Sequence, residues 1–321
     1  MSSTTTSSYH RPDERIDRLP DVSRENKAEI SGTLDRVGMS DIETRVLIMD
    51  DSGTTVATPA KADAFVRLDR GSDRGIHMSR LFVGLDRILQ QGPLSQGLLE
   101  SVLDSFLESH QNQTSAAFLK LEFQYQLRRA ALLSDNSGWR TYPVTLSAER
   151  TEMGTTFELG AQIVYSSACP CSGALARHLT EQRFLETFRG ESVSRDEVAA
   201  WLDREEGMAG CPHSQRSHGT VRTRTNGLTG GLGIRELIDR LEAAIVTVVQ
   251  TAVKREDEQE FARLNAENLM FCEDAARRMR AALEADESIV DYWIEARHFE
   301  SLHPHDAVSI ATKGIPGGYR A

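Results

Sequence analysis

The amino-acid sequence predicts an α+β protein of two similar halves, each an antiparallel sheet with a pair of helices on one face. Three observations support this fold class. Several segments alternate strictly between apolar and polar residues, as half-buried antiparallel strands do. Other segments repeat apolar residues at helical spacing. The order strand, strand, helix, helix, strand, strand occurs twice along the chain, which indicates an internal duplication.

The first half is expected over residues 36–152, after a flexible N-terminal arm of residues 1–35 that is rich in Ser, Thr and charge. The segments "SDIETRVLIMD" and "ADAFVRLDR" predict its first two strands. Helical spacing over residues 77–110 predicts two helices, divided at Gly92 and Pro93. The segments "FLKLEFQYQLRR" and "WRTYPVTLSAER" then predict a hairpin around the turn "SDNSG".

The second half is expected over residues 153–321. Its first strands are predicted in "TTFELGAQIVYSS" and "HGTVRTRT", with a helical insert of residues 174–207 between them. The insert should hold two helices, the second starting at a capping box of Ser194 and Glu197. A helix over residues 234–254 and a shorter one in "FCEDAARRMRAALEA" precede the strands "SIVDYWIEARHFES" and "DAVSIATK". The free sheet edges favour oligomerisation into a closed barrel.

Composition excludes several classes of protein. A chain of 321 residues that is 39% hydrophobic and 26% charged can bury a core of its own, and its net charge of −11 argues against binding a long nucleic-acid duplex. No stretch approaches the roughly 20 apolar residues of a membrane span. The first residues, "MSSTTTSSYHRPDERIDRLPD", contain no hydrophobic signal core, so we expect a cytoplasmic protein whose four cysteines are reduced.

Cysteine and histidine gather in the second half of the chain. Cys169 and Cys171 end a predicted strand, and strand parity would project both to the same side. Histidines follow in "CPHSQRSHG" and "ARHFESLHPHDAV". A structural zinc site usually needs paired C-x₂-C motifs, and a thioredoxin-like motif needs C-x-x-C, so neither fits. A catalytic metal centre with one thiolate, imidazoles and a carboxylate fits better.

Four motifs in order support a family resemblance: "YSSACPCSGAL", "PHSQRSHGTV", "KREDEQEFARLNAENLMFCEDAARRMRAAL" and "VDYWIEARHFESLHPHDAVS". With "RGIHMSR" at residues 74–80, they resemble the type IB GTP cyclohydrolase family, over most of the chain from about residue 36. The resemblance implies tandem tunnelling-fold modules, a homotetramer, and hydrolysis of GTP to 7,8-dihydroneopterin triphosphate and formate, which opens tetrahydrofolate, pteridine or deazaguanine synthesis. The alternative is another tunnelling-fold pterin or deazapurine enzyme, such as a nitrile reductase.

The resemblance also implies roles for individual residues. One divalent ion per subunit, Zn²⁺, Mn²⁺ or Fe²⁺, would be held by Cys169, His213, Glu258 and His303. The resemblance implies that Cys171 and Glu300 are catalytic groups and that Glu273 binds guanine. His305 or His218 is a further candidate for proton transfer. The triphosphate needs cations, for which the candidates are Arg216, His77, Arg80 and Arg74.

Two of these choices stay open from the sequence. In an ideal strand Glu300 and His303 face opposite sides, so either a bend before Pro304 reconciles them or His305 is the ligand. Glu256 competes with Glu258 because it lies two residues away in the same polar run.

Overall fold

The computed structural model describes residues 27–50, 53–225, 227–228 and 232–321, so most of the predicted arm lies outside the described residues. The strands are β1 (Leu34–Met49), β2 (Thr55–Leu68), β3 (Ala117–Ala130), β4 (Ser137–Thr151), β5 (Gly154–Ala168), β6 (Ser214–Thr225), β7 (Ile289–His298) and β8 (Ala307–Thr312). The helices are α2 (Met78–Leu89), α3 (Gln96–Ser109), α4 (Pro170–Thr187), α5 (Arg195–Leu202), α6 (Ile234–Ile245), α7 (Arg255–Glu267) and α8 (Cys272–Glu284), with a short 3₁₀ turn η2 (Glu205–Gly207).

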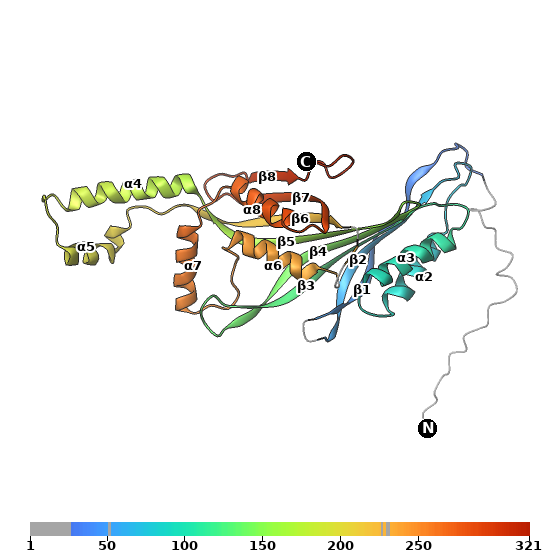
Figure 1. The fold of residues 1–321 in the computed structure, drawn as a ribbon, viewed down its shortest axis with the longest axis horizontal. Coiled ribbons are helices and arrows are strands. Elements are labelled where there is room, and N and C mark those ends of the chain that lie inside the picture. The colour runs from blue at the N-terminus through green and yellow to red at the C-terminus, as the bar shows by residue number, and fades with distance from the viewer. Residues whose placement is uncertain (1–26, 51–52, 226, 229–231) are drawn as a thin grey trace, which may run out of the picture.

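The strands form one 8-stranded antiparallel sheet in which each strand pairs with the next along the chain (Figure 1). The predicted α+β class is confirmed. The repeated order of strands and helices is also present, except that three helices rather than two lie between β6 and β7. The predicted boundary at residues 152 and 153 falls in the turn between β4 and β5, where the sheet continues without a break. The two predicted modules therefore share one continuous sheet, and the division between them stays a prediction.

One continuous apolar core joins the sheet to the helices. It includes Leu121 of β3 and Ile163 of β5, and Leu85 of α2, Phe106 of α3 and Ile238 of α6, each at most 1% exposed. Burying a side chain of this size contributes roughly 1.5–3 kcal/mol. The alternating polar positions of the same strands face the other way. The sheet thus has one face covered by helices and one polar face.

The predicted helix over residues 234–254 is wrong in its second half. Helix α6 ends at Ile245, and Val246 has a positive φ of 72°. The segment from Val246 to Val249 consists of β-branched residues, which favour extended backbone. Its backbone joins the end of β5, with Val248 bridged to Tyr165. A further helix, α7, then begins at Arg255.

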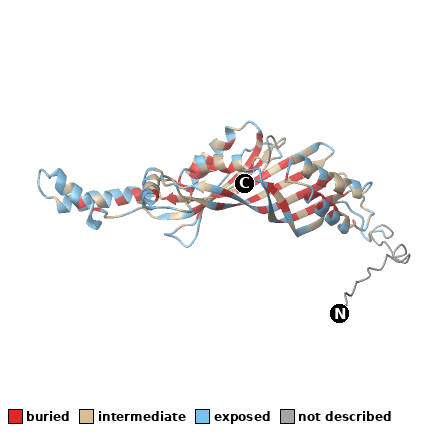
Figure 2. Ribbon diagram, turned by 90° about the horizontal axis from the view of Figure 1, so that it is seen from below, coloured by how far each residue is buried: buried red, intermediate tan, exposed pale blue. Residues whose placement is uncertain are grey.

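The two helices of the predicted insert are present and extend away from the sheet (Figure 1). Figure 2 shows them as largely exposed. They pack on each other through Phe184, Phe188 and Trp201, whose ring centroids lie 5.1–5.9 Å apart. Helix α5 does follow Ser194, but the Ser194 side chain makes no capping hydrogen bond, so the predicted capping box is wrong.

None of the helices among the described residues is both long enough and apolar enough to cross a membrane.

Candidate active site

The beginnings of α4 and β6 lie against each other. Helix α4 begins at Pro170, which suits a first helical position because it has no N–H to satisfy. Cys169 is therefore the N-cap residue, and its sulfur accepts a hydrogen bond from the Ser172 N–H at 3.5 Å. The Cys169 N–H donates to the carbonyl oxygen of His213 at 3.1 Å. The first two predicted ligands are thus brought together at one helix terminus.

The expected parity of the two cysteines is wrong, because Cys171 does not lie on a strand. It falls in the first turn of α4 and is exposed, whereas Cys169 is half-buried at the helix N-cap. Proline ends the strand and starts the helix at the same residue. The two thiols are consequently placed in different backbone environments.

The His213 ring points its Nδ1 toward two acceptors. Nδ1 lies 3.1 Å from Gln215 Oε1 and 3.7 Å from Glu300 Oε2. The Glu300 side chain is 14% exposed. Strand β7 ends at His298, so Glu300 lies in the turn before β8 rather than on a strand. The structure therefore brings Glu300 to His213, and the strand-parity argument does not apply to it.

His303 and His305 lie in the same turn but contact each other. Their rings are stacked with centroids 5.0 Å apart and planes 9° apart, and both residues are exposed. Among the described residues, no group of three or more His, Cys, Asp or Glu side chains gathers as a metal site would require. Cys169 and His213 meet through their backbones and have the donor types that a divalent ion takes. His303 and Glu258 fit one by donor type alone.

Glu258 lines a pocket of about 450 Å³ together with Gln215 and Arg216. The pocket lies between the start of β6 and the helix α7. Glu256, the competing carboxylate, is not among the described residues that line it. Of the two candidates, Glu258 is the one that shares a pocket with the start of β6, the strand that follows His213.

Asp257, which the sequence interpretation missed, fixes the start of α7. It is fully buried and accepts hydrogen bonds from the backbone N–H groups of Lys254, Leu133 and Ser134 and from the Ser134 hydroxyl. These hydrogen bonds, the Lys254 N–H first, hold the pKa of the Asp257 carboxyl well below its usual range. The sequence could have indicated this role, because Asp257 is the third residue of a helix, where an acidic side chain often caps the helix.

Glu273 is exposed at the start of α8, next to a buried polar cluster. The Cys272 sulfur lies 3.3 Å from Glu273 Oε2 and 3.3 Å from Ser309 Oγ. Burial raises the pKa of the Cys272 thiol, so it is a neutral donor. Nearby, the Tyr165 hydroxyl and His298 Nε2 share a hydrogen bond of 3.1 Å. Burial lowers the pKa of His298 to about 4, which keeps this ring neutral at pH 7.

The predicted triphosphate groups are not gathered in one chain. Arg216 lines the pocket beside Glu258, whereas His77 and Arg80 lie at the start of α2. Arg80 donates to the carbonyl oxygen of Ser109 at 2.8 Å. Figure 1 shows α2 and α7 toward opposite ends of the sheet. Within a single copy, His77 and Arg80 therefore do not share a site with Arg216.

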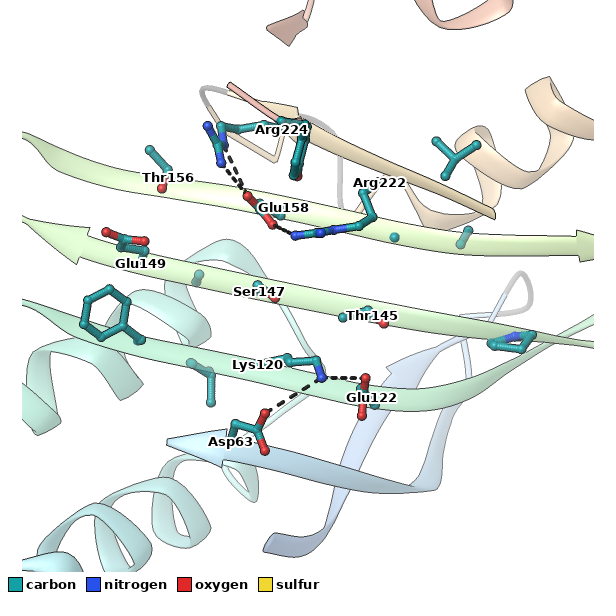
Figure 3. A pocket seen from close by; sticks show the side chains of 18 of the residues that line it. Asp63, Lys120, Glu122, Thr145, Ser147, Glu149, Thr156, Glu158, Arg222 and Arg224 are labelled. Carbon is teal, nitrogen blue, oxygen red and sulfur yellow. Dashed lines mark hydrogen bonds and ion pairs between the residues drawn. The ribbon is translucent and has the colours of Figure 1, made fainter. Parts of the chain in front are cut away.

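A larger pocket of about 1020 Å³ lies on the polar face of the sheet and contains none of the predicted site residues. Its charged side chains are paired with one another, Glu158 with Arg222 and Arg224, and Lys120 with Asp63 and Glu122 (Figure 3). Because these charges already neutralise each other, this pocket is a poorer candidate for the reaction than the region around Cys169 and His213.

Comparisons with known proteins show the family of the chain. Residues 19–309 match the family model described as type I GTP cyclohydrolase folE2. The chain is 45% identical over 301 residues to a GTP cyclohydrolase FolE2 of Hydrogenovibrio crunogenus, covering 94% of this chain and 96% of the relative. It is 45% identical over 303 residues to that of Pseudoalteromonas translucida, covering 94% of this chain and 100% of the relative.

Among solved structures, the uricase of Arthrobacter globiformis matches with a TM-score of 0.55 and 9% identity, covering 92% of this chain and 98% of the uricase. At this identity the likeness concerns the fold alone, which is the tunnelling fold. The sequence match covers nearly the whole chain, including the Cys169, His213 and Glu258 segments. The chain belongs to the type I GTP cyclohydrolase family of the FolE2 kind.

Proposed function

We propose that the protein hydrolyses GTP to 7,8-dihydroneopterin triphosphate and formate, the entry reaction of tetrahydrofolate and other pteridine or deazaguanine synthesis. The observation that carries the proposal is the match to GTP cyclohydrolases along residues 19–309. Because GTP is an intracellular metabolite, the reaction belongs in the cytoplasm. A nitrile reductase on the same fold is not favoured, since the family model and the relatives are cyclohydrolases.

The proposed metal site is built on Cys169 and His213, with Glu258 and His303 or His305 completing it. Support comes from the hydrogen bond between the Cys169 and His213 backbones. It also comes from the pocket that Glu258 lines together with Gln215, which is two residues after His213. When bound, a divalent ion supplies a water whose pKa is lowered to about 7. Among the described residues these side chains do not yet gather as a metal site, so binding an ion would require them to move together.

We propose roles for the remaining groups that their positions support. Glu300 is half-buried beside the His213 ring, in a position to take part in proton transfer. Cys171 is exposed in the first turn of α4 and is available to the substrate. Glu273 is exposed at the start of α8, and one carboxylate can accept both the N1–H and the 2-amino group of guanine. Arg216 faces the pocket with a cation for the triphosphate.

The proposed assembly is a homotetramer. Strands β1 and β8 are the two edges of the sheet, and exposed edges are commonly covered by further pairing. A second copy could also bring His77 and Arg80 to Arg216, which one copy keeps apart. The oligomeric state can be measured by light scattering coupled to size-exclusion chromatography.

The experiment that tests the function is incubation of purified protein with GTP and either Mn²⁺ or Zn²⁺. The expected products are formate and, after oxidation, a fluorescent pterin. Metal analysis of the same preparation should find one divalent ion per subunit. If the protein releases no formate from GTP but reduces a nitrile substrate with a nicotinamide cofactor, the function is that of a nitrile reductase and not of a cyclohydrolase.

A further inference from the structure

A short series of hydrogen bonds runs from His213 into the buried sheet. His213 Nδ1 lies 3.1 Å from Gln215 Oε1, and Gln215 Nε2 donates to Ser167 Oγ at 2.7 Å. The hydroxyls of Ser167 and Ser217 share a further hydrogen bond of 2.8 Å, and both serines are 0% exposed. Ser167 and Gln215 face each other in the register of β5 and β6, so the backbone of two paired strands holds the series in place.

The chemistry of these groups fixes which hydrogen lies where. The Gln215 amide offers one acceptor and one donor, and its N–H group is used by Ser167. Its carbonyl oxygen, an acceptor only, is left to face the His213 ring. Glu300 places a second acceptor 3.7 Å from the same nitrogen. Two acceptors on one side of the ring require the proton to be on Nδ1.

The opposite arrangement is electrostatically unfavourable. Turning the Gln215 amide over would direct its N–H to Nδ1, which would then need a lone pair. That lone pair would also face the Glu300 carboxyl oxygen 3.7 Å away, so two acceptors would be set against each other. The carboxylate therefore decides the orientation of the amide, and the amide in turn connects the ring to the buried serines.

We propose that Gln215 is a positioning residue that holds His213 in the Nδ1–H tautomer, so that the Nε2 lone pair is the one presented to a metal ion. The inference rests on the proposed function, since it takes His213 as a ligand. Outer hydrogen bonds of this kind orient ligating histidines, and losing one typically costs about 10- to 100-fold in metal affinity. Gln215 would hold His213 in this tautomer before any ion is bound.

The test uses metal-free full-length protein with ¹⁵N-labelled histidine. Long-range ¹H–¹⁵N correlation spectra report the tautomer of His213, whose signals are identified by their loss in His213→Asn. We expect Nδ1–H in the unmutated protein, a shift toward Nε2–H in Gln215→Leu, and a return to Nδ1–H in Gln215→Glu, which restores an acceptor. Zinc affinity, measured by competition with a chromophoric chelator, should fall about 10- to 100-fold in Gln215→Leu and recover in Gln215→Glu.

The chain offers a matched control. Gln162 also joins β5 to β6, donating to Thr220 Oγ1 at 3.0 Å, but lies on the polar face of the sheet away from His213. Gln162→Leu should leave both the tautomer and the zinc affinity unchanged. An equal loss of affinity in Gln162→Leu and Gln215→Leu would overturn the proposal, because general damage to the two strands would then explain both.

The outcomes separate this inference from the proposed function. An Nε2–H tautomer in the unmutated protein, or a Gln215→Leu variant with unchanged tautomer and affinity, overturns the role of Gln215 while formate release from GTP still supports the function. Conversely, absence of formate with a tautomer that depends on Gln215 overturns the cyclohydrolase and supports the positioning of His213.

Discussion

The carboxylate of Asp257 accepts hydrogen bonds from the backbone N–H of Ser134 at 2.9 Å and from its hydroxyl at 2.5 Å, across 123 residues of chain. Ser134 lies in the turn between β3 and β4, and Asp257 lies in the first turn of α7. The hairpin of the first half thus holds the helix that presents Glu258. A contact within the fold positions a predicted ligand without touching it.

Replacing Asp257 by Ala should therefore loosen α7. Three backbone N–H groups and one hydroxyl would lose their acceptor, and unsatisfied polar groups in a buried position are destabilising. We expect the thermal unfolding midpoint to fall by several degrees and turnover to fall with it. Glu256→Ala, at an exposed position of the same turn, is the control and should change the midpoint little. Equal midpoints for the two variants would show that the Ser134 contact does not hold the helix.

Replacing Cys169 and replacing Cys171 should have different effects on metal content. Cys169→Ala removes the thiol at the N-cap beside His213, so we expect loss of bound metal together with loss of turnover. Cys171→Ala should keep the metal and still lose most turnover, since the exposed Cys171 thiol is assigned to the substrate. Metal content by mass spectrometry and formate release measure the two effects. A fully metallated Cys169→Ala protein would contradict the ligand assignment.

Glu273→Gln should weaken guanine recognition. An amide presents one acceptor and one donor where the two guanine donors need a carboxylate, and hydrogen bonds to charged groups contribute about 1.5–3 kcal/mol. The expected result is a KM for GTP raised about 10- to 100-fold with metal content unchanged. Steady-state kinetics with metal analysis check this. A KM equal to that of the unmutated enzyme would remove Glu273 from the guanine site.

The buried His298 predicts a pH dependence of stability. The pKa of His298 is about 4 in the folded protein and ordinarily 6.5. Between these two pH values the ring is therefore protonated in the unfolded chain and neutral in the folded protein. The stabilisation is complete above pH 6.5 and is lost as the pH falls toward 4. By pH 5 the loss attributable to His298 is about 2 kcal/mol.

His298→Gln removes this titration, so its unfolding midpoint should fall less between pH 7 and pH 5 than that of the unmutated protein. Tyr165→Phe is the companion variant, because it removes the hydroxyl bonded to His298 Nε2 but leaves the ring buried. It should keep the steep pH dependence. Parallel pH profiles for His298→Gln and the unmutated protein would assign the acid lability to other groups.

The insert should be removable without loss of the sheet. Its two ends meet, because a side chain on Gly210 would contact Ala176 and the Cys169 N–H is bonded to the His213 carbonyl. Replacing residues 177–209 by a short glycine linker should therefore leave the circular dichroism spectrum of the strands and the unfolding midpoint nearly unchanged. A collapse of the midpoint would mean that the insert stabilises the body of the protein.

The fold was largely predictable from local pattern. Strict alternation, as from Leu119 to Leu127, identified strands because one face of the sheet is buried and the other is polar. The error at residues 246–254 arose because apolar residues at helical spacing run on past Ile245. What ends the helix is the β-branched run and its pairing with β5, and such a pairing depends on a strand about 80 residues earlier in the chain.

The site was less predictable, because its contacts are not local. Motifs and family resemblance selected Cys169 and His213, which the structure places together. The parity rule failed for Glu300 because it lies in a turn, where side-chain direction follows no fixed period. Asp257 looked like one more charge in a solvated polar run. Its role depends on Ser134, which no spacing in the sequence connects to it.

The strand order has a consequence for synthesis of the protein. Each strand pairs with the one made just before it, from β1 through β8. As the chain leaves the ribosome, every new strand finds its partner edge already in place, and no strand has to wait for a later one to be inserted beside it. The sheet can thus grow in the direction of translation, one hairpin at a time, with the Cys169 and His213 segments joining after five strands are assembled.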